Sequence, residues 1–193
     1  MFEGDSPIVA VARLPAGFTL VELLVVMVVG AILLAIAVPA LQGLFAANQL
    51  TTITDGFATA LSEARSEAAK LNINVQLTPA NGGVDWSGGW TMVVAGAAAP
   101  GMPSTLRTGA PVPAGYTLKS TASFNGGVTF DSTGRLSAGA PGEFVICQGP
   151  FPAAGGRAQM ITVAASGRVR IAQNDASGNP LADDNTSVTT CTP

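Results

Sequence analysis

The hydrophobic residues of this chain are concentrated in one long run near its N-terminus. Between Leu23 and Thr54 the sequence contains no Asp, Glu, Lys or Arg. The core of that run, residues 24–45, exceeds the roughly 20 apolar residues that cross about 30 Å of hydrocarbon as an α-helix. A helix buried in the core of a soluble domain is the alternative, but such helices rarely lack a polar face over this length. The pattern therefore predicts a transmembrane helix over residues 18–45.

After this run, apolar residues recur every three or four positions, which is the period of one helix face. The stripe consists of Leu50, Ile53, Phe57, Leu61, Ala64, Ala68 and Leu71. The opposite side is polar, and Glu67 and Lys70 are spaced for a surface ion pair. The helix is therefore predicted to continue over 46–72 as an amphipathic segment that packs on a globular head.

From Asn72 onward the period changes to two, in short apolar runs separated by turn residues. The predicted strands are 73–78, 90–95, 116–120, 128–131, 143–148, 160–164 and 169–173. The last two are joined by Ser166 and Gly167, which predicts a hairpin. The segment after Ala95 and the tail from Asn174 are predicted to be loops. The fold class is therefore α+β: a long N-terminal helix packed on a small antiparallel β-sheet head over 73–193.

Composition narrows the functions that this fold could carry. With 48% hydrophobic and 11% charged residues, much of the chain is not ordinary water-facing surface. The absence of His removes the commonest general base and metal ligand, and two Cys are too few for a thiolate zinc site. The formal net charge of -3 argues against a surface that binds nucleic acid everywhere, but it is compatible with a local basic patch.

Two acidic groupings are candidate chemical sites. Asp131 and Glu143 could converge as a carboxylate pair, but no nucleophile with a base and no phosphate-binding loop accompanies them. The tail offers oxygen ligands for calcium, but with no recognisable spacing. These tail residues are Asp175, Asn179, Asp183, Asp184 and Asn185. The sequence therefore predicts no enzyme, no metal site and no cofactor.

One carboxylate, Glu22, lies at the edge of the apolar run. An ionised carboxylate in a bilayer is costly unless a cation accompanies it. Glu22 could instead lie in the headgroup region as an ordinary boundary residue. The residues around it, GFTLVELLVVMVVGAILLAIAVPAL over 17–41, resemble the N-terminal signature of type IV pilins and pseudopilins.

This resemblance implies a processing and assembly site. A prepilin peptidase would cut between Gly17 and Phe18, and the new amino group of Phe18 would be N-methylated. Glu22 falls at the acidic position of the signature and Pro39 at its helix-breaking position. The new amino group lies one helical turn from Glu22, or on the next subunit of a filament, and could supply its counter-charge. The leader, residues 1–17, departs from the usual basic pattern, because only Arg13 balances Glu3 and Asp5; a start codon assigned too far upstream would explain this.

Segments in the head resemble, in order, the GspH/FimT group of minor pilins and pseudopilins, known in secretion systems as type II secretion system protein H. They are ARSEAAKLNINVQL, WSGGWTMVV, the Leu106–Arg107 pair, VTFDSTGRL, EFVIC, ITVAASGRVRI and the final Cys191. The resemblance implies a structural subunit at or near the tip of a type II secretion pseudopilus or a type IV pilus. It further implies an inner-membrane anchor, a periplasmic head, and other pilins and the prepilin peptidase as partners.

Cys147 and Cys191 are predicted to form a disulfide, since a periplasmic head lies in an oxidising compartment. Such a bridge would tie the C-terminal tail to a strand. Two free thiols are the alternative.

The last chemical feature is a pair of arginines, Arg168 and Arg170, two residues apart in a predicted strand. This spacing puts both on one face, with Arg157 as a candidate neighbour, and two guanidinium groups can bind phosphates. The Gly-Arg-x-Arg element resembles one in FimT-type pilins associated with DNA uptake in transformation. DNA binding is therefore the alternative function, and two solvated arginines paired with Asp175, Asp183 or Asp184 are the structural alternative.

Overall fold

The computed structural model describes residues 17, 19–96, 101, 103–149, 151 and 156–192. Most of the leader, together with Phe18, falls outside these residues. The chain forms two compact units, Met1–Gly43 and Leu44–Pro193.

The helix α1 runs from Leu20 to Leu71 and contributes to both units. Its first turn is capped by Thr19, whose side-chain oxygen accepts a hydrogen bond of 3.2 Å from the backbone N–H of Glu22. Thr19 and Glu22 have the three-residue spacing of a capping box, with Thr19 as the N-cap. At the other end Asn72 takes a left-handed φ of 55°, and the N–H of Ile73 donates to the carbonyl of Ala68 at 3.2 Å. This is the Schellman pattern that ends a helix.

Eight strands and one 3₁₀ helix follow in the described part of the head. They are β1 (Val75–Pro79), β2 (Trp90–Val94), β3 (Thr105–Gly109), β4 (Tyr116–Ser120), η1 (Ala122–Phe124), β5 (Val128–Phe130), β6 (Gly142–Gln148), β7 (Arg157–Val163) and β8 (Val169–Ile171). The predicted strand over 116–120 coincides with β4, and the other predicted strands overlap observed ones. β3 falls where the sequence predicted no strand.

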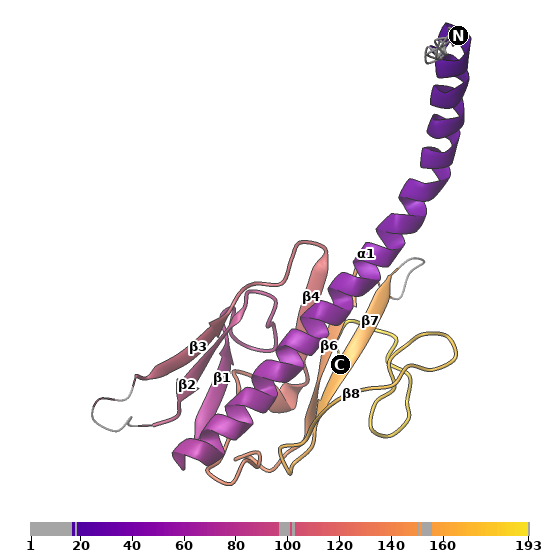
Figure 1. Cartoon of the computed structure of the whole chain (residues 1–193). Coiled ribbons are helices and arrows are strands. Elements are labelled where there is room, and N and C mark those ends of the chain that lie inside the picture. The colour runs from indigo at the N-terminus through magenta and orange to yellow at the C-terminus, as the bar shows by residue number, and fades with distance from the viewer. Residues whose placement is uncertain are drawn as a thin grey trace, which may run out of the picture. The chain divides into compact units, whose positions relative to one another are not determined.

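The strands form two four-stranded antiparallel sheets, where the sequence predicted a single small sheet. The first has the order β3-β2-β1-β5 and the second the order β4-β6-β7-β8. In Figure 1, β1 to β3 lie on one side of the head portion of α1 and β6 to β8 on the other. The helix stripe therefore packs against both sheets.

The core of the head lies between this stripe and the two sheets. Leu61, Ala64 and Ala68 are fully buried, as are Leu77 of the first sheet and Phe144 of the second. Burying a side chain such as Leu or Phe contributes about 1.5–3 kcal/mol, so this face of α1 is a main source of the head's stability.

Phe57 of α1 lies at the centre of the aromatic cluster. Its ring makes edge contacts with Trp86, Trp90 and Phe144, at centroid distances of 5.6, 6.4 and 4.8 Å. Edge-to-face pairs of this kind add about 0.5–1.5 kcal/mol beyond area burial. The cluster therefore joins the helix to both sheets, through Trp90 of β2 and Phe144 of β6.

Candidate functional site

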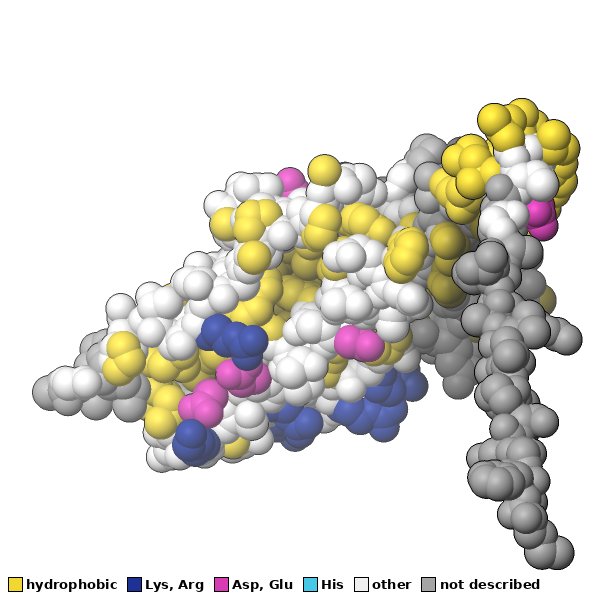
Figure 2. Space-filling model, turned by 45° about the horizontal axis from the view of Figure 1, so that its top comes forward, with side chains coloured by type: hydrophobic (Ala, Val, Ile, Leu, Met, Phe, Trp, Pro, Cys, Tyr) yellow, Lys and Arg dark blue, Asp and Glu magenta, His cyan; other side chains and the backbone are white. Residues whose placement is uncertain are grey.

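The N-terminal stretch of α1 carries its apolar side chains exposed. Leu20, Val28, Ile36 and Phe45 are between 51% and 80% exposed, and the most apolar 18-residue window of this helix has none of its residues buried. Figure 2 shows hydrophobic side chains covering this stretch at the upper right. By length and composition the helix could cross a membrane. Apolar surface of this extent is typical of a membrane or protein interaction site.

Glu22 lies in the first turn of α1 and is exposed. A carboxylate there is stabilised by the N-terminal end of the helix dipole, by a few tenths to about 1 kcal/mol at an exposed position. The capping residue Thr19 was missed in the sequence analysis, although the pattern Thr-x-x-Glu before an apolar run is its signal. Gly17 is exposed, and its neighbour Phe18 lies outside the described residues. Position 39 lies within α1, but the side chain of Pro39 is outside the description.

The hairpin that carries Arg168 and Arg170 has a turn of three residues. The N–H of Ala164 donates to the carbonyl of Arg168 at 3.0 Å, and the N–H of Gly167 donates to the carbonyl of Ala164 at 2.8 Å. Gly167 takes a φ of 77°, the left-handed conformation that such turns require. The predicted hairpin is therefore present, with Ala165 added to the turn.

The two arginines of this hairpin do not share one site. Arg170 lies in β8, is half-exposed and forms an ion pair with Asp183 of the tail. Arg168 precedes β8 and lines a hollow beside α1 together with Arg65. Arg157 lies at the far end of β7, opposite Gln148, and not near the turn. For Arg170, this ion pair is the structural alternative given in the sequence analysis, in which the arginines pair with acidic residues of the tail.

The disulfide between Cys147 and Cys191 is present, with Cα atoms 5.9 Å apart and a sequence separation of 44. Cys147 belongs to a second buried cluster with Val145, Ala158 and Met160, on which tail residues including Val188 pack. The bridge therefore holds the tail over the face of the second sheet that lies away from α1.

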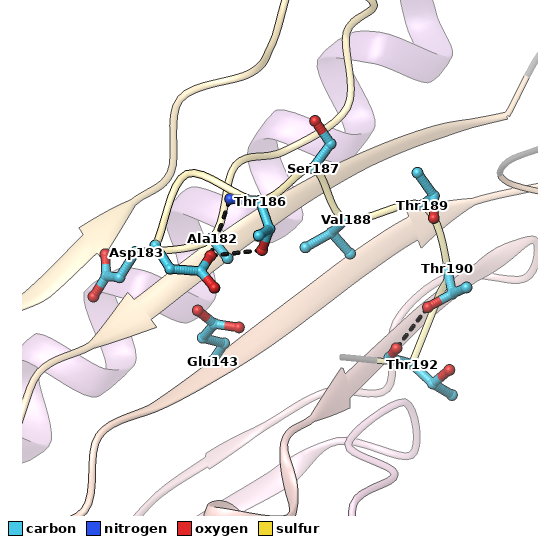
Figure 3. A pocket seen from close by; sticks show the side chains of 10 residues that line it. Glu143, Ala182, Asp183, Thr186, Ser187, Val188, Thr189, Thr190 and Thr192 are labelled. Carbon is cyan, nitrogen blue, oxygen red and sulfur yellow. Dashed lines mark hydrogen bonds between the residues drawn. The ribbon is translucent and has the colours of Figure 1, made fainter.

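Beneath the tail, Glu143 points from β6 toward the turn that carries Asp183 and Thr186 (Figure 3). Burial raises the pKa of Glu143, and the negative charges of Asp183 and Asp184 raise it further, while a hydrogen bond from the backbone of Asp183 lowers it. Asp131 lies after β5 of the other sheet, where its carboxylate accepts hydrogen bonds from Thr133 and Arg135. Asp131 and Glu143 thus lie on different sheets, each engaged in its own surroundings.

The tail carboxylates that are candidate calcium ligands accept hydrogen bonds or an ion pair from protein donors. Asp175 accepts hydrogen bonds from Ser177, Asn179 and Ser187, and Asp184 accepts two from Thr186. Among the described residues, no three His, Cys, Asp or Glu side chains are grouped so that they could hold a metal ion. The carboxylates of Asp175 and Asp184 close turns, and that of Asp183 pairs with Arg170.

Comparison with known proteins identifies the class and then the family. Residues 13–38 match the prokaryotic N-terminal methylation motif. With the exposed apolar helix and the α+β head, this match defines a pilin-like protein with an N-terminal methylation motif. The family model of the type II transport protein GspH matches residues 54–167. The chain therefore belongs to the GspH family, which confirms the resemblance found in the sequence.

Solved structures of minor pilins share this fold. Two crystal forms of the type IV minor pilin FimU of Pseudomonas aeruginosa (strain PAO1) are 21% and 20% identical, with TM-scores of 0.56 and 0.54. They cover 75% and 74% of this chain and 96% and 99% of their own chains. The minor pseudopilin EpsH of the Vibrio cholerae type 2 secretion system is 11% identical, with a TM-score of 0.45, and covers 64% of this chain and 95% of its own. No curated protein matches the sequence.

Proposed function

We propose that this chain is a structural minor subunit of a type II secretion pseudopilus or a type IV pilus, incorporated at or near the filament tip. The observation that carries this proposal is the exposed apolar stretch of α1, which needs a partner outside the head. A bilayer supplies that partner before assembly, and the helices of other subunits supply it afterwards. The chain acts by packing and not by catalysis.

In this proposal the precursor lies in the inner membrane with its head in the periplasm. Prepilin peptidase cuts between Gly17 and Phe18, and the amino group of Phe18 is methylated. The resulting cation neutralises Glu22, on the same or on a neighbouring subunit, because an intramembrane carboxylate needs a counter-charge. Pro39 supplies a point where the helix can adjust to its neighbours.

Replacing Glu22 tests this assembly role. Glu22→Ala removes an intramembrane charge, so the chain should remain in the membrane at the parent level while its signal in sheared filaments falls. A matched control is Asp55→Ala, which removes an exposed acid from the head portion of the same helix. Immunoblots of membrane and filament fractions measure both. Unchanged incorporation of Glu22→Ala would refute the counter-charge role.

A second candidate function is DNA binding by the hairpin arginines during uptake. The exposed guanidinium of Arg168 favours it, because no acidic partner contacts this group among the described residues. The pairing of Arg170 with Asp183 weakens it. The Lys and Arg side chains visible in Figure 2 also form separate groups and no continuous field. Filament assembly therefore ranks first.

Gel shifts of duplex DNA with the full chain in non-ionic detergent test this second function. Binding without sequence preference is expected, and two phosphate contacts would make the affinity fall about tenfold for a fourfold rise in salt. The double variant Arg168→Ala, Arg170→Ala should lose most of the shift while far-UV circular dichroism stays unchanged. An unchanged shift in the double variant would leave only the structural role.

A further inference from the structure

A hollow of about 380 Å³ lies between the polar side of α1 and the turn that joins β7 to β8. Its volume is within the range of about 300–1,000 Å³ that is usual for ligand pockets. The charged side chains that line it are both cations, Arg65 from the helix and Arg168 from the turn. The polar lining residues are Ser62, Ser66 and Thr133.

Arg65 is held in position by the turn after β5. Its Nε donates to the carbonyl oxygen of Gly134 at 2.9 Å, and this oxygen also lies against Gly167. A Cβ atom on Gly167 would come within 1.9 Å of it, so only glycine permits this close approach of the two turns. No other hydrogen bond of Arg65 occurs among the described residues. Its two terminal nitrogens therefore remain as a fork of N–H donors.

The acidic residues that could neutralise this pair of cations are engaged elsewhere. Glu63 forms an ion pair with Arg107, and Glu67 forms one with Lys70. Asp131 accepts three hydrogen bonds within its own turn. The hollow therefore keeps two positive charges without a carboxylate partner in the described part of the chain.

Two serine hydroxyls of α1 complete the lining. Ser62 donates to the carbonyl of Ala58 and Ser66 to that of Glu63, both at 2.8 Å. These bonds are local and exposed, so rotation of the side chain would turn either hydroxyl toward a bound group at small cost. Two guanidinium groups with hydroxyls beside them form a donor set that suits phosphate oxygens.

We propose that this hollow binds a phosphate oxyanion between Arg65 and Arg168. The group is either a free pyrophosphate or polyphosphate, or the phosphodiester backbone of a nucleic acid, since both present the same oxygens. This site goes beyond filament membership, and it requires no contribution from Arg170. It draws on a helix residue, Arg65, that the Gly-Arg-x-Arg pattern does not include.

Calorimetric titration of the full chain in non-ionic detergent with pyrophosphate at low salt tests the site. The parent chain should bind one pyrophosphate. Arg168→Gln should weaken binding about tenfold or more, because it removes a charge-assisted hydrogen bond. Ser66→Glu, an exposed substitution that puts a carboxylate into the hollow, should weaken it at least as much. The control Lys119→Gln, which removes a cation of β4 that does not line the hollow, should change affinity by less than about twofold.

Tryptophan fluorescence of each variant during urea unfolding serves as the folding check. Competition with a short DNA duplex separates the two sources: displacement of pyrophosphate assigns the site to a nucleic-acid backbone, and no displacement assigns it to free phosphates. Either result supports the site. The proposal is overturned if the parent chain does not bind pyrophosphate, if Lys119→Gln loses as much affinity as Arg168→Gln, or if Ser66→Glu binds as the parent does. None of these results depends on filament incorporation.

Discussion

Both halves of α1 carry large apolar side chains, but these side chains are exposed in the N-terminal half and buried in the head. Leu33 in the N-terminal half is 62% exposed, whereas Leu61 in the head is 0% exposed. In the first half apolar residues occur on every side of the helix, and in the second they form one stripe against two sheets. The stripe finds its partner within the chain. Among the described residues of its own unit, the N-terminal half has no such partner, and its apolar side chains are exposed.

The head, in contrast, contains its whole core. The buried hydrophobic residues of the described chain begin at Leu50 and end at Val163. A change in the N-terminal half should therefore leave the head folded, and a change in the stripe should not.

The largest expected effect comes from one aspartate placed in each half. Leu61→Asp buries an unpaired charge. The free energy needed to desolvate that charge exceeds the free energy of unfolding of a typical domain, so the head should unfold. Leu33→Asp should leave the head at parental stability. It should still deplete the chain from sheared filaments, because a charge at a packed apolar position disrupts helix association. Urea unfolding followed by tryptophan fluorescence reports on the head, since both Trp86 and Trp90 lie in it.

Ser62→Asp, next to Leu61 but exposed, is the matched control and should unfold at the parental urea midpoint. If Leu33→Asp lowered the midpoint as Leu61→Asp does, the two halves would not be independent.

The disulfide should have the next largest effect, confined to the head. A bridge with a sequence separation of 44 stabilises by up to about 4 kcal/mol on the loop-entropy model. The double variant Cys147→Ser, Cys191→Ser should lose up to this amount in urea unfolding, because the tail is no longer tied to β6. Membrane retention should be unchanged. A variant as stable as the parent would show that the tail packs without its bridge.

The smallest expected effect is a pH dependence of the tail turn around Asp175, whose carboxylate accepts hydrogen bonds from residues of the tail itself. Hydrogen bonds from the Ser187 hydroxyl and from Asn179 lower the pKa of Asp175 from 3.8 to about 2. The ionised carboxylate therefore stabilises the tail above pH 3.8, and this contribution is lost as the pH falls toward 2. The amide NMR signals of Ser177 and Asn179 should titrate with a midpoint near pH 2, and Asp175→Asn should abolish that titration. A midpoint at the ordinary value would show that the turn is open in solution.

Periodicity predicted most elements of the fold but only one strand pairing, the hairpin of β7 and β8. The helix stripe and β4 follow from spacing, because each has one buried face. β3 was missed, since its sequence TLRTG is polar and mostly exposed. It is held by its ladder with β2 and by the ion pair of Arg107 with Glu63 of α1. Division into two sheets depends on contacts between distant strands, which alternation within a strand does not report.

The basic residues show the same limit. Strand alternation predicted one face for Arg168 and Arg170. Arg168, however, closes the turn before β8 and lines the hollow beside α1, whereas Arg170 pairs with Asp183. The ion pair of Arg170 with Asp183 requires the tail to lie over the second sheet. The disulfide and the packing of the tail hold it there. Sequence reasoning did not single out Arg65, because its partner Gly134 is 69 residues away.

In the proposed assembly, the apolar half of α1 is buried in a filament after processing at Gly17. Mass spectrometry of sheared, washed filaments should therefore find a chain that begins at an N-methylated Phe18. Recovery of the intact Met1 terminus in assembled filaments, or detection of the chain in membranes alone while filaments are abundant, would contradict it.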